Sequence, residues 1–112
     1  MTRWIEWTCR LALALAGVSA LAPASGQDRA GDQAAIEAGE AVYNNNCQTC
    51  HGERLVSTGQ IFDLRRLSAG DRARFENAVR NGKNQMPPWK DVLSDEEIAQ
   101  LWAYVRANAH QR

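Results

Sequence analysis

Net charge, cysteine and long apolar runs are all scarce in this 112-residue chain. Its 13 basic and 13 acidic residues give a formal net charge of zero, so it lacks the excess positive charge with which nucleic-acid-binding domains attract phosphate. The apolar run at residues 11–21 is too short for a membrane-spanning helix, which needs about 20 residues. The sequence therefore predicts neither a nucleic-acid partner nor stable membrane insertion of the mature protein.

The N-terminal segment has the features of a secretory signal. Two arginines flank a polar start, residues 11–21 are apolar or small, and the small residues APASG follow. This pattern predicts a signal peptide over residues 1–26, cleaved after Ala24 or Gly26, and a periplasmic domain over residues 27–112. An uncleaved membrane anchor and a buried core helix are the alternatives.

The mature segment is small for a chain without a cofactor. Removal of the signal takes away two basic residues and one acidic residue. The mature segment then has 11 basic and 12 acidic residues and a formal charge of −1. At roughly 86 residues with few apolar side chains, a purely hydrophobic core is marginal. A large apolar cofactor at the centre would stabilise such a fold.

Apolar residues recur with helical spacing in three stretches. We expect a flexible lead-in at 27–31 and a first helix over residues 33–45, ended by three asparagines. A second helix follows over residues 71–81, with Gly82 as its stop. A last helix begins at the capping box formed by Ser94 and Glu97. No strand pattern is present, so the fold class predicted is all-α, with three or more helices.

The segments between these helices are irregular. Residues 52–70 carry scattered apolar anchors and are punctuated by Gly59 and Gly70, and residues 83–92 form a loop that contains the sequence MPPW. Neither proline fits a helix interior, so Met86 lies on a loop with restricted backbone freedom.

The most informative motif is Cys47-Gln48-Thr49-Cys50-His51. The spacing C-x-x-C-H is the attachment signature of c-type haem. Two thiols at i and i+3 can reach the two vinyl groups on one edge of the porphyrin, and the adjacent imidazole can ligate the iron. We therefore expect one covalently bound haem c per chain, held by Cys47 and Cys50, with His51 as the proximal ligand.

Other uses of this motif remain open alternatives. A thioredoxin-like dithiol belongs with a βαβ pattern, which the chain lacks. A zinc site needs about four ligands, and the mature chain offers two cysteines, His51 and His110. A plain disulfide suits the periplasm but explains neither the adjacent histidine nor a remote methionine.

Met86 is the candidate for the second axial ligand of the iron. It is the sole methionine after signal removal and lies 35 residues beyond His51, far enough for the chain to reach the other haem face. A thioether sulfur suits haem iron and raises its reduction potential. His110 is the competitor, and its place near the chain end is typical of a solvated tail residue.

Taken together, these elements resemble class I cytochrome c. The helix with Gly39 and Tyr43, the CQTCH motif, the MPPW loop and the last helix with Trp102 follow that family's order over residues 34–107. The resemblance implies that the first and last helices cross closely at Gly39, with Tyr43 and Trp102 packed around the crossing.

One departure from the family concerns the proximal histidine. Family members usually carry a proline shortly after the motif, whose neighbouring carbonyl accepts the histidine N–H, but residues 52–85 contain no proline. The hydrogen-bond partner of His51 is therefore unidentified. Candidates to meet a haem propionate are Arg54, Arg65, Arg66, Lys83, Trp89 and Lys90, with Arg65 and Trp89 as the preferred pair.

The function these features predict is outer-sphere electron transfer between redox proteins, and not enzymatic catalysis. Six iron ligands leave no position for a substrate. MPPW followed by VLSDEEI is also similar to small cytochromes that accept electrons from quinoprotein alcohol dehydrogenases, and delivery to a terminal oxidase is an equal alternative. The rival classes are a haem peroxidase, which requires an open iron site, and a thiol oxidoreductase, which requires free thiols.

Overall fold

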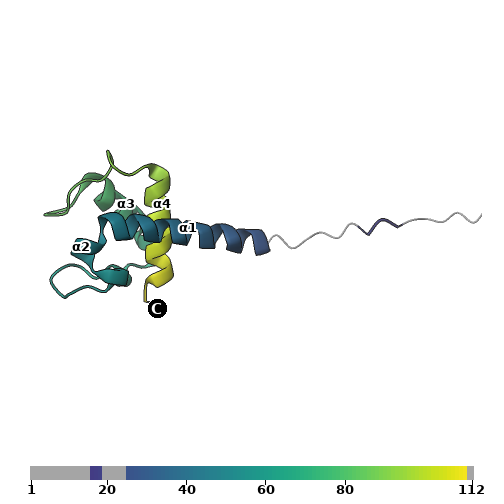
Figure 1. Cartoon of the computed structure of the whole chain (residues 1–112), viewed down its shortest axis with the longest axis horizontal. Coiled ribbons are helices and arrows are strands. Elements are labelled where there is room, and N and C mark those ends of the chain that lie inside the picture. The colour runs from purple at the N-terminus through teal and green to yellow at the C-terminus, as the bar shows by residue number, and fades with distance from the viewer. Residues whose placement is uncertain (1–15, 19–24, 111–112) are drawn as a thin grey trace, which may run out of the picture.

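The structure is a computed structural model that describes residues 16–18 and 25–110, and every regular element within them is helical (Figure 1). The α-helices are α1 (Ser25–Asn46), α2 (Gln48–His51), α3 (Arg72–Asn81) and α4 (Asp95–Asn108). Three short 3-10 turns lie between α2 and α3, namely η1 (Glu53–Leu55), η2 (Leu64–Arg66) and η3 (Ala69–Asp71). The predicted all-α fold class is confirmed.

A crossing of α1 and α4 organises the fold, and Figure 1 shows the two helices lying across one another. Their backbones approach so closely that a Cβ built on Gly39 would overlap the carbonyl group of Gln100. Beside this contact Tyr43 of α1 packs against Tyr104 of α4, with ring centroids 5.3 Å apart. Gly39 and Tyr43 thus lie where the resemblance implies, and Tyr104 is the aromatic partner that sequence reasoning missed.

We expect Gly39→Ala to destabilise the protein by about 2–3 kcal/mol, because the added methyl group meets backbone atoms that no rotamer change can move. Gly31→Ala is the matched control in the same helix, since a Cβ there has nothing within 4 Å. It should stabilise the protein by up to about 1 kcal/mol through the higher helix propensity of alanine. Denaturation midpoints measure both effects, and equal midpoints for the two variants would contradict the close crossing.

The second helix pair is α3 with α4. Trp102 of α4 is buried and packs on Phe75 of α3, with ring centroids 5.2 Å apart. Trp102, expected beside the crossing, thus has its aromatic partner in α3. At the start of α4 the predicted capping box is formed by reciprocal hydrogen bonds of 3.1 Å between Ser94 and Glu97. The expected end of the second helix at Gly82 is also confirmed.

Two stretches are more helical than the sequence indicates. Helix α1 begins at Ser25, whereas we expected a flexible lead-in over residues 27–31. Its first turns project from the body of the molecule (Figure 1), so they need no apolar stripe and show no apolar periodicity in the sequence. The helix can still form there, because no proline interrupts it. The motif after α1 is also helical: residues 48–51 form the single turn α2, with Cys47 as its N-cap.

The predicted signal peptide, residues 1–26, lies almost entirely outside the described residues, so its removal stays a prediction. The longest helix of the described part, α1, has 22 residues and carries acidic side chains along its length. Within residues 16–18 and 25–110, no helix combines the length and the apolar character needed to cross a bilayer.

Candidate functional site

The motif residues Cys47, Cys50 and His51 lie on one helical turn. The N–H of Cys47 donates to the carbonyl of Tyr43 (2.8 Å), so the chain continues directly from α1. The N–H of His51 donates in turn to the carbonyl of Cys47 (3.0 Å). Positions three and four residues apart share one face of a helix. The turn therefore brings two thiols and an imidazole to the same side, as haem attachment requires.

That side borders a cavity of about 680 Å³, within the roughly 300–1,000 Å³ typical of ligand pockets. Its walls come from all four α-helices and from the loops around residues 60–64 and 83–89. All four residues predicted to bind haem line it: Cys47, Cys50, His51 and Met86. The rest of the wall is largely apolar and aromatic, including Ile61, Phe62, Leu64, Leu67, Phe75, Val79, Trp89, Leu101 and Val105.

The two thiols are not joined by a disulfide, and their environment does not favour thiol catalysis. Burial, together with the neighbouring Cys50, raises the pKa of the Cys47 thiol to about 11. Catalytic dithiols instead have a thiol pKa lowered to between about 3.5 and 7.5. The site therefore argues against a thiol oxidoreductase, and the βαβ unit of that class is absent from the described residues.

His51 is partly buried, and this burial lowers the pKa of its imidazole. The neutral form, which is the one that binds metals, is favoured. Its Nδ1 atom is buried and has no hydrogen-bond partner within the described part of the chain. An orphaned buried polar atom is rare in native proteins and needs an explanation, such as a bound group at the site. The hydrogen-bond partner of His51, which the sequence left unidentified, is thus not found among the described residues either.

Tyr43 holds the backbone next to His51. Its hydroxyl donates to the carbonyl of Gly52 (2.5 Å), and burial raises the pKa of that hydroxyl to about 12, so it remains protonated. Gly52 has a φ of 88°, and a Cβ there would overlap the carbonyl of Val56. Sequence reasoning took Tyr43 for a core residue, whereas its hydroxyl also positions the residue that follows the motif.

Met86 is held in place by a tight turn at the end of α3. Backbone hydrogen bonds in both directions join Lys83 and Met86 (3.0 and 3.1 Å), with Asn84 at a φ of 54° between them. The N–H of Trp89 donates to the carbonyl of Val79 in α3 (2.8 Å), which ties the loop to the helix. Met86 is partly buried and packs against the core. The loop thus directs a restrained thioether into the cavity wall.

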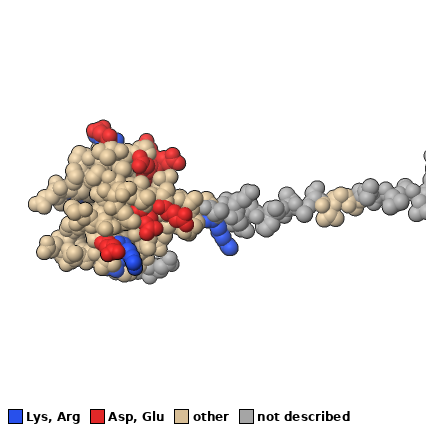
Figure 2. Space-filling view, in the orientation of Figure 1, with Lys and Arg blue, Asp and Glu red and all other residues tan. Residues whose placement is uncertain are grey.

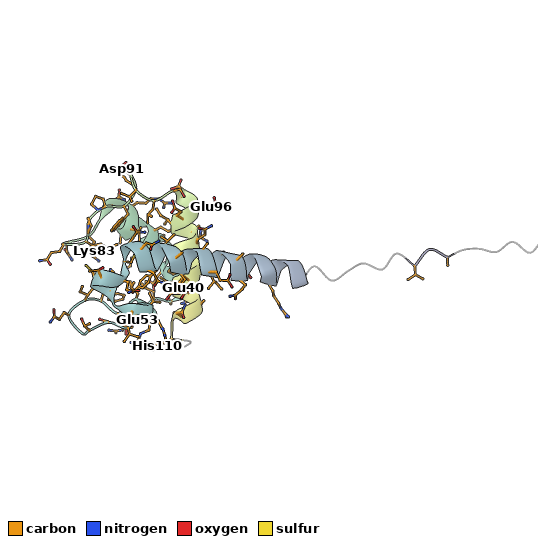
Figure 3. The ribbon with its side chains drawn as sticks, viewed as in Figure 1. Glu40, Glu53, Lys83, Asp91, Glu96 and His110 are labelled. Atoms are coloured by element: carbon orange, nitrogen blue, oxygen red, sulfur yellow. The ribbon has the colours of Figure 1, made fainter. Side chains whose placement is uncertain are left out.

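His110, the competing ligand, lies elsewhere. It is exposed, does not line the cavity, and its backbone N–H donates to the carbonyl of Arg65 (2.9 Å). In Figure 3 it lies at the bottom of the molecule, well apart from Lys83 at the loop end. This position agrees with the tail role that we expected.

The six candidates for propionate contacts divide into two groups. Lys83 and Trp89 line the cavity, and Arg54, Arg65, Arg66 and Lys90 do not. Of the preferred pair, Trp89 lines the cavity, whereas Arg65 does not and its guanidinium donates two hydrogen bonds of 3.0 Å to Asp63, so this pair stays a prediction that the geometry does not favour. Arg74 of α3 lines the cavity instead. No local signal separates Arg74 from its neighbours, since its direction depends on how α3 packs.

A family model described as cytochrome c oxidase, cbb3-type, subunit III matches residues 34–105. The quinohemoprotein alcohol dehydrogenase ADH-IIG of Pseudomonas putida is 35% identical over 81 residues, which are 70% of this chain and 11% of that protein. Cytochrome c6 of Euglena gracilis is 37% identical over 78 residues, 63% of this chain and 90% of that protein. Cytochrome c550 of Pseudomonas aeruginosa is 34% identical over 80 residues, 65% of this chain and 55% of that protein. The chain thus spans about a tenth of the dehydrogenase, and no solved structure matches it significantly.

The chain belongs to this cytochrome family. It is a small cytochrome c domain. Cytochromes c carry a covalently attached haem, and the residues present fit that group, because the cavity is largely apolar and joins two thiols, a neutral imidazole and a thioether.

Proposed function

We propose that the mature protein is a periplasmic carrier of single electrons with one haem c per chain. Cys47 and Cys50 would hold the haem through thioether bonds, and His51 and Met86 would ligate its iron. The observation that carries this proposal is the convergence of these four side chains on one largely apolar cavity. When bound, the haem supplies the redox chemistry, since its iron alternates between the ferric and ferrous states.

The protein residues have complementary tasks. The single helical turn α2, together with its N-cap Cys47, fixes both cysteines and His51 relative to one another, so attachment and proximal ligation come from one rigid turn. Met86 offers a soft sulfur from a separate, restrained loop, and a methionine ligand raises the potential relative to a second histidine. With both axial positions taken by side chains, no site is left for a substrate, which supports a carrier over a peroxidase.

The partners that we propose are a dehydrogenase as donor and a terminal oxidase as acceptor. Support comes from the likeness to a segment of ADH-IIG and to the cbb3-type oxidase subunit CcoP of Azospirillum brasilense, which is 34% identical over 87 residues. Stopped-flow mixing with a substrate-reduced quinoprotein alcohol dehydrogenase, and separately with a cbb3-type oxidase, measures each exchange. Failure to exchange electrons with either would contradict these partners while leaving the carrier function intact.

The carrier function can be tested on protein recovered from the periplasm of a host that matures cytochromes c. We expect the mass to correspond to a chain beginning at Ser25 or Gln27, and a potentiometric titration to follow a one-electron Nernst curve. Cyanide and peroxide should leave the spectrum unchanged, because both axial positions are filled. An intact Met1 would contradict signal cleavage. Rapid binding of peroxide by the ferric protein would instead indicate an open iron and a peroxidase.

A further inference from the structure

The three arginines of α3 differ in how their guanidinium groups are used. Arg72 donates to Glu76 (2.8 Å), and Arg80 donates to both Glu76 (3.2 Å) and Asp95 (3.0 Å). Arg74 donates no hydrogen bond to any described residue, and its nearest carboxylate oxygen, on Asp71, is 3.7 Å away. Arg74 therefore keeps its donors available while its two neighbours on the helix do not.

Arg74 is also the arginine of α3 that reaches the cavity. It lines the wall together with Ala78, four residues further on and hence on the same helix face. Its guanidinium lies 5.4 Å from the ring centroid of Phe62, another wall residue, and this cation–π contact holds the group at the cavity's edge.

The charge of the cavity wall has one sign. Arg74 and Lys83 are its cationic side chains, and no aspartate or glutamate is among the residues that line it. In Figure 2 the acidic side chains of the visible face gather mainly towards α1 and α4, and the end where the loops project is largely uncharged. A group with carboxylates at its edge would meet attraction and no repulsion in this wall.

We propose that Arg74 binds a propionate carboxylate of the haem. The inference rests on the proposed function, because the carboxylate belongs to the haem held by Cys47, Cys50 and His51. Arg74 is favoured over Lys83 because a guanidinium offers a planar fork that matches a carboxylate, whereas an ammonium is a point charge.

This contact has a measurable consequence. An adjacent arginine lowers the pKa of a carboxyl by about one to three units. Reduction of the iron makes the site more negative, which favours the protonated form of the propionate. The reduction potential therefore falls as the pH rises through the propionate pKa. Arg74 shifts this fall in potential to a lower pH. Lys83 is the other cationic side chain of the wall, and Asp71, which does not line the cavity, lies 3.7 Å from the guanidinium of Arg74. Helix α1 and the loop around residue 60 contribute the neutral Asn46 and Gln60.

The test measures the reduction potential of the purified, haem-loaded protein between pH 4 and 9. In Arg74→Gln the fall in reduction potential should occur at a pH higher by about one to three pH units. Arg74→Lys should reverse part of that shift, because a point charge replaces a fork. Arg72→Gln is the control, since it removes the same charge from the same helix but does not line the cavity. This variant should leave the pH at which the reduction potential falls unchanged.

One result would contradict the role of Arg74, and a different one would contradict the proposed function. If Arg74→Gln and Arg72→Gln lower the potential alike at every pH and neither moves the fall, Arg74 acts only as a distant charge and the proposal is wrong. If the parent protein holds no haem after denaturation, the proposed function itself has failed. That outcome is recognised before any titration, so the two failures are distinct.

Discussion

The double variant Cys47→Ala/Cys50→Ala should lose all of its haem on denaturation, whereas the parent protein should lose none. These are the two cysteines of residues 27–112, and both line the cavity that His51 and Met86 share. Without them the haem is held by coordination and apolar contact alone, both of which end when the chain unfolds. Gel filtration in guanidinium, monitored by haem absorbance, separates bound from released haem.

Single variants are the controls for this experiment. Cys47→Ala and Cys50→Ala should each keep a haem that co-elutes with the denatured chain, because one thioether still joins them. The double variant should also be less stable than the parent protein, since a chain of this size depends on the haem to complete its core and no covalent bond retains the haem. If the parent protein has two titratable thiols after denaturation, the attachment does not exist.

Replacement of Met86 should have the second-largest effect. Ferric protein should show the weak charge-transfer band at the red end of the visible spectrum that sulfur ligation gives, and Met86→Ala should abolish it. The open sixth position should then bind cyanide readily. Met86→His should restore six-coordination with a reduction potential lower by on the order of tenths of a volt, within the roughly 0.8 V over which axial ligands tune haem.

His110→Ala is the matched control for the methionine variants. His110 is exposed and outside the cavity wall, so its removal should alter neither the band nor the potential. A spectrum that survives Met86→Ala but changes with His110→Ala would overturn the ligand assignment. The covalent attachment through Cys47 and Cys50 would not be affected by that result.

Features set by local chemistry were predictable from the sequence. The capping box of Ser94 and Glu97 and the stop at Gly82 each depend on residues within one helical turn. The close crossing at Gly39 followed from the family resemblance, and the structure accounts for it, because a side chain there has no room beside Gln100. The four candidates for haem binding followed from the CQTCH motif and from Met86, the sole methionine of residues 27–112.

Helical turns without an apolar stripe, and side-chain directions set by tertiary packing, were not predictable in this way. The start of α1 at Ser25 has no apolar periodicity to announce it, and α2 has four residues, too few for a periodic signal. Arg65 and Arg74 are both arginines near apolar residues, yet Asp63 binds the first while the packing of α3 turns the second towards the cavity. Side-chain direction at such positions depends on contacts that sequence spacing does not contain.

The most direct test of the account is the mass of one peptide. Trypsin cleaves after Arg29 and Arg54, so it releases residues 30–54, which contain Cys47, Cys50 and His51. After acid–acetone extraction of the periplasmic protein, this peptide should carry the added mass of one haem and the haem absorbance. A peptide of unmodified mass with two free thiols, or with a disulfide between them, would contradict the account.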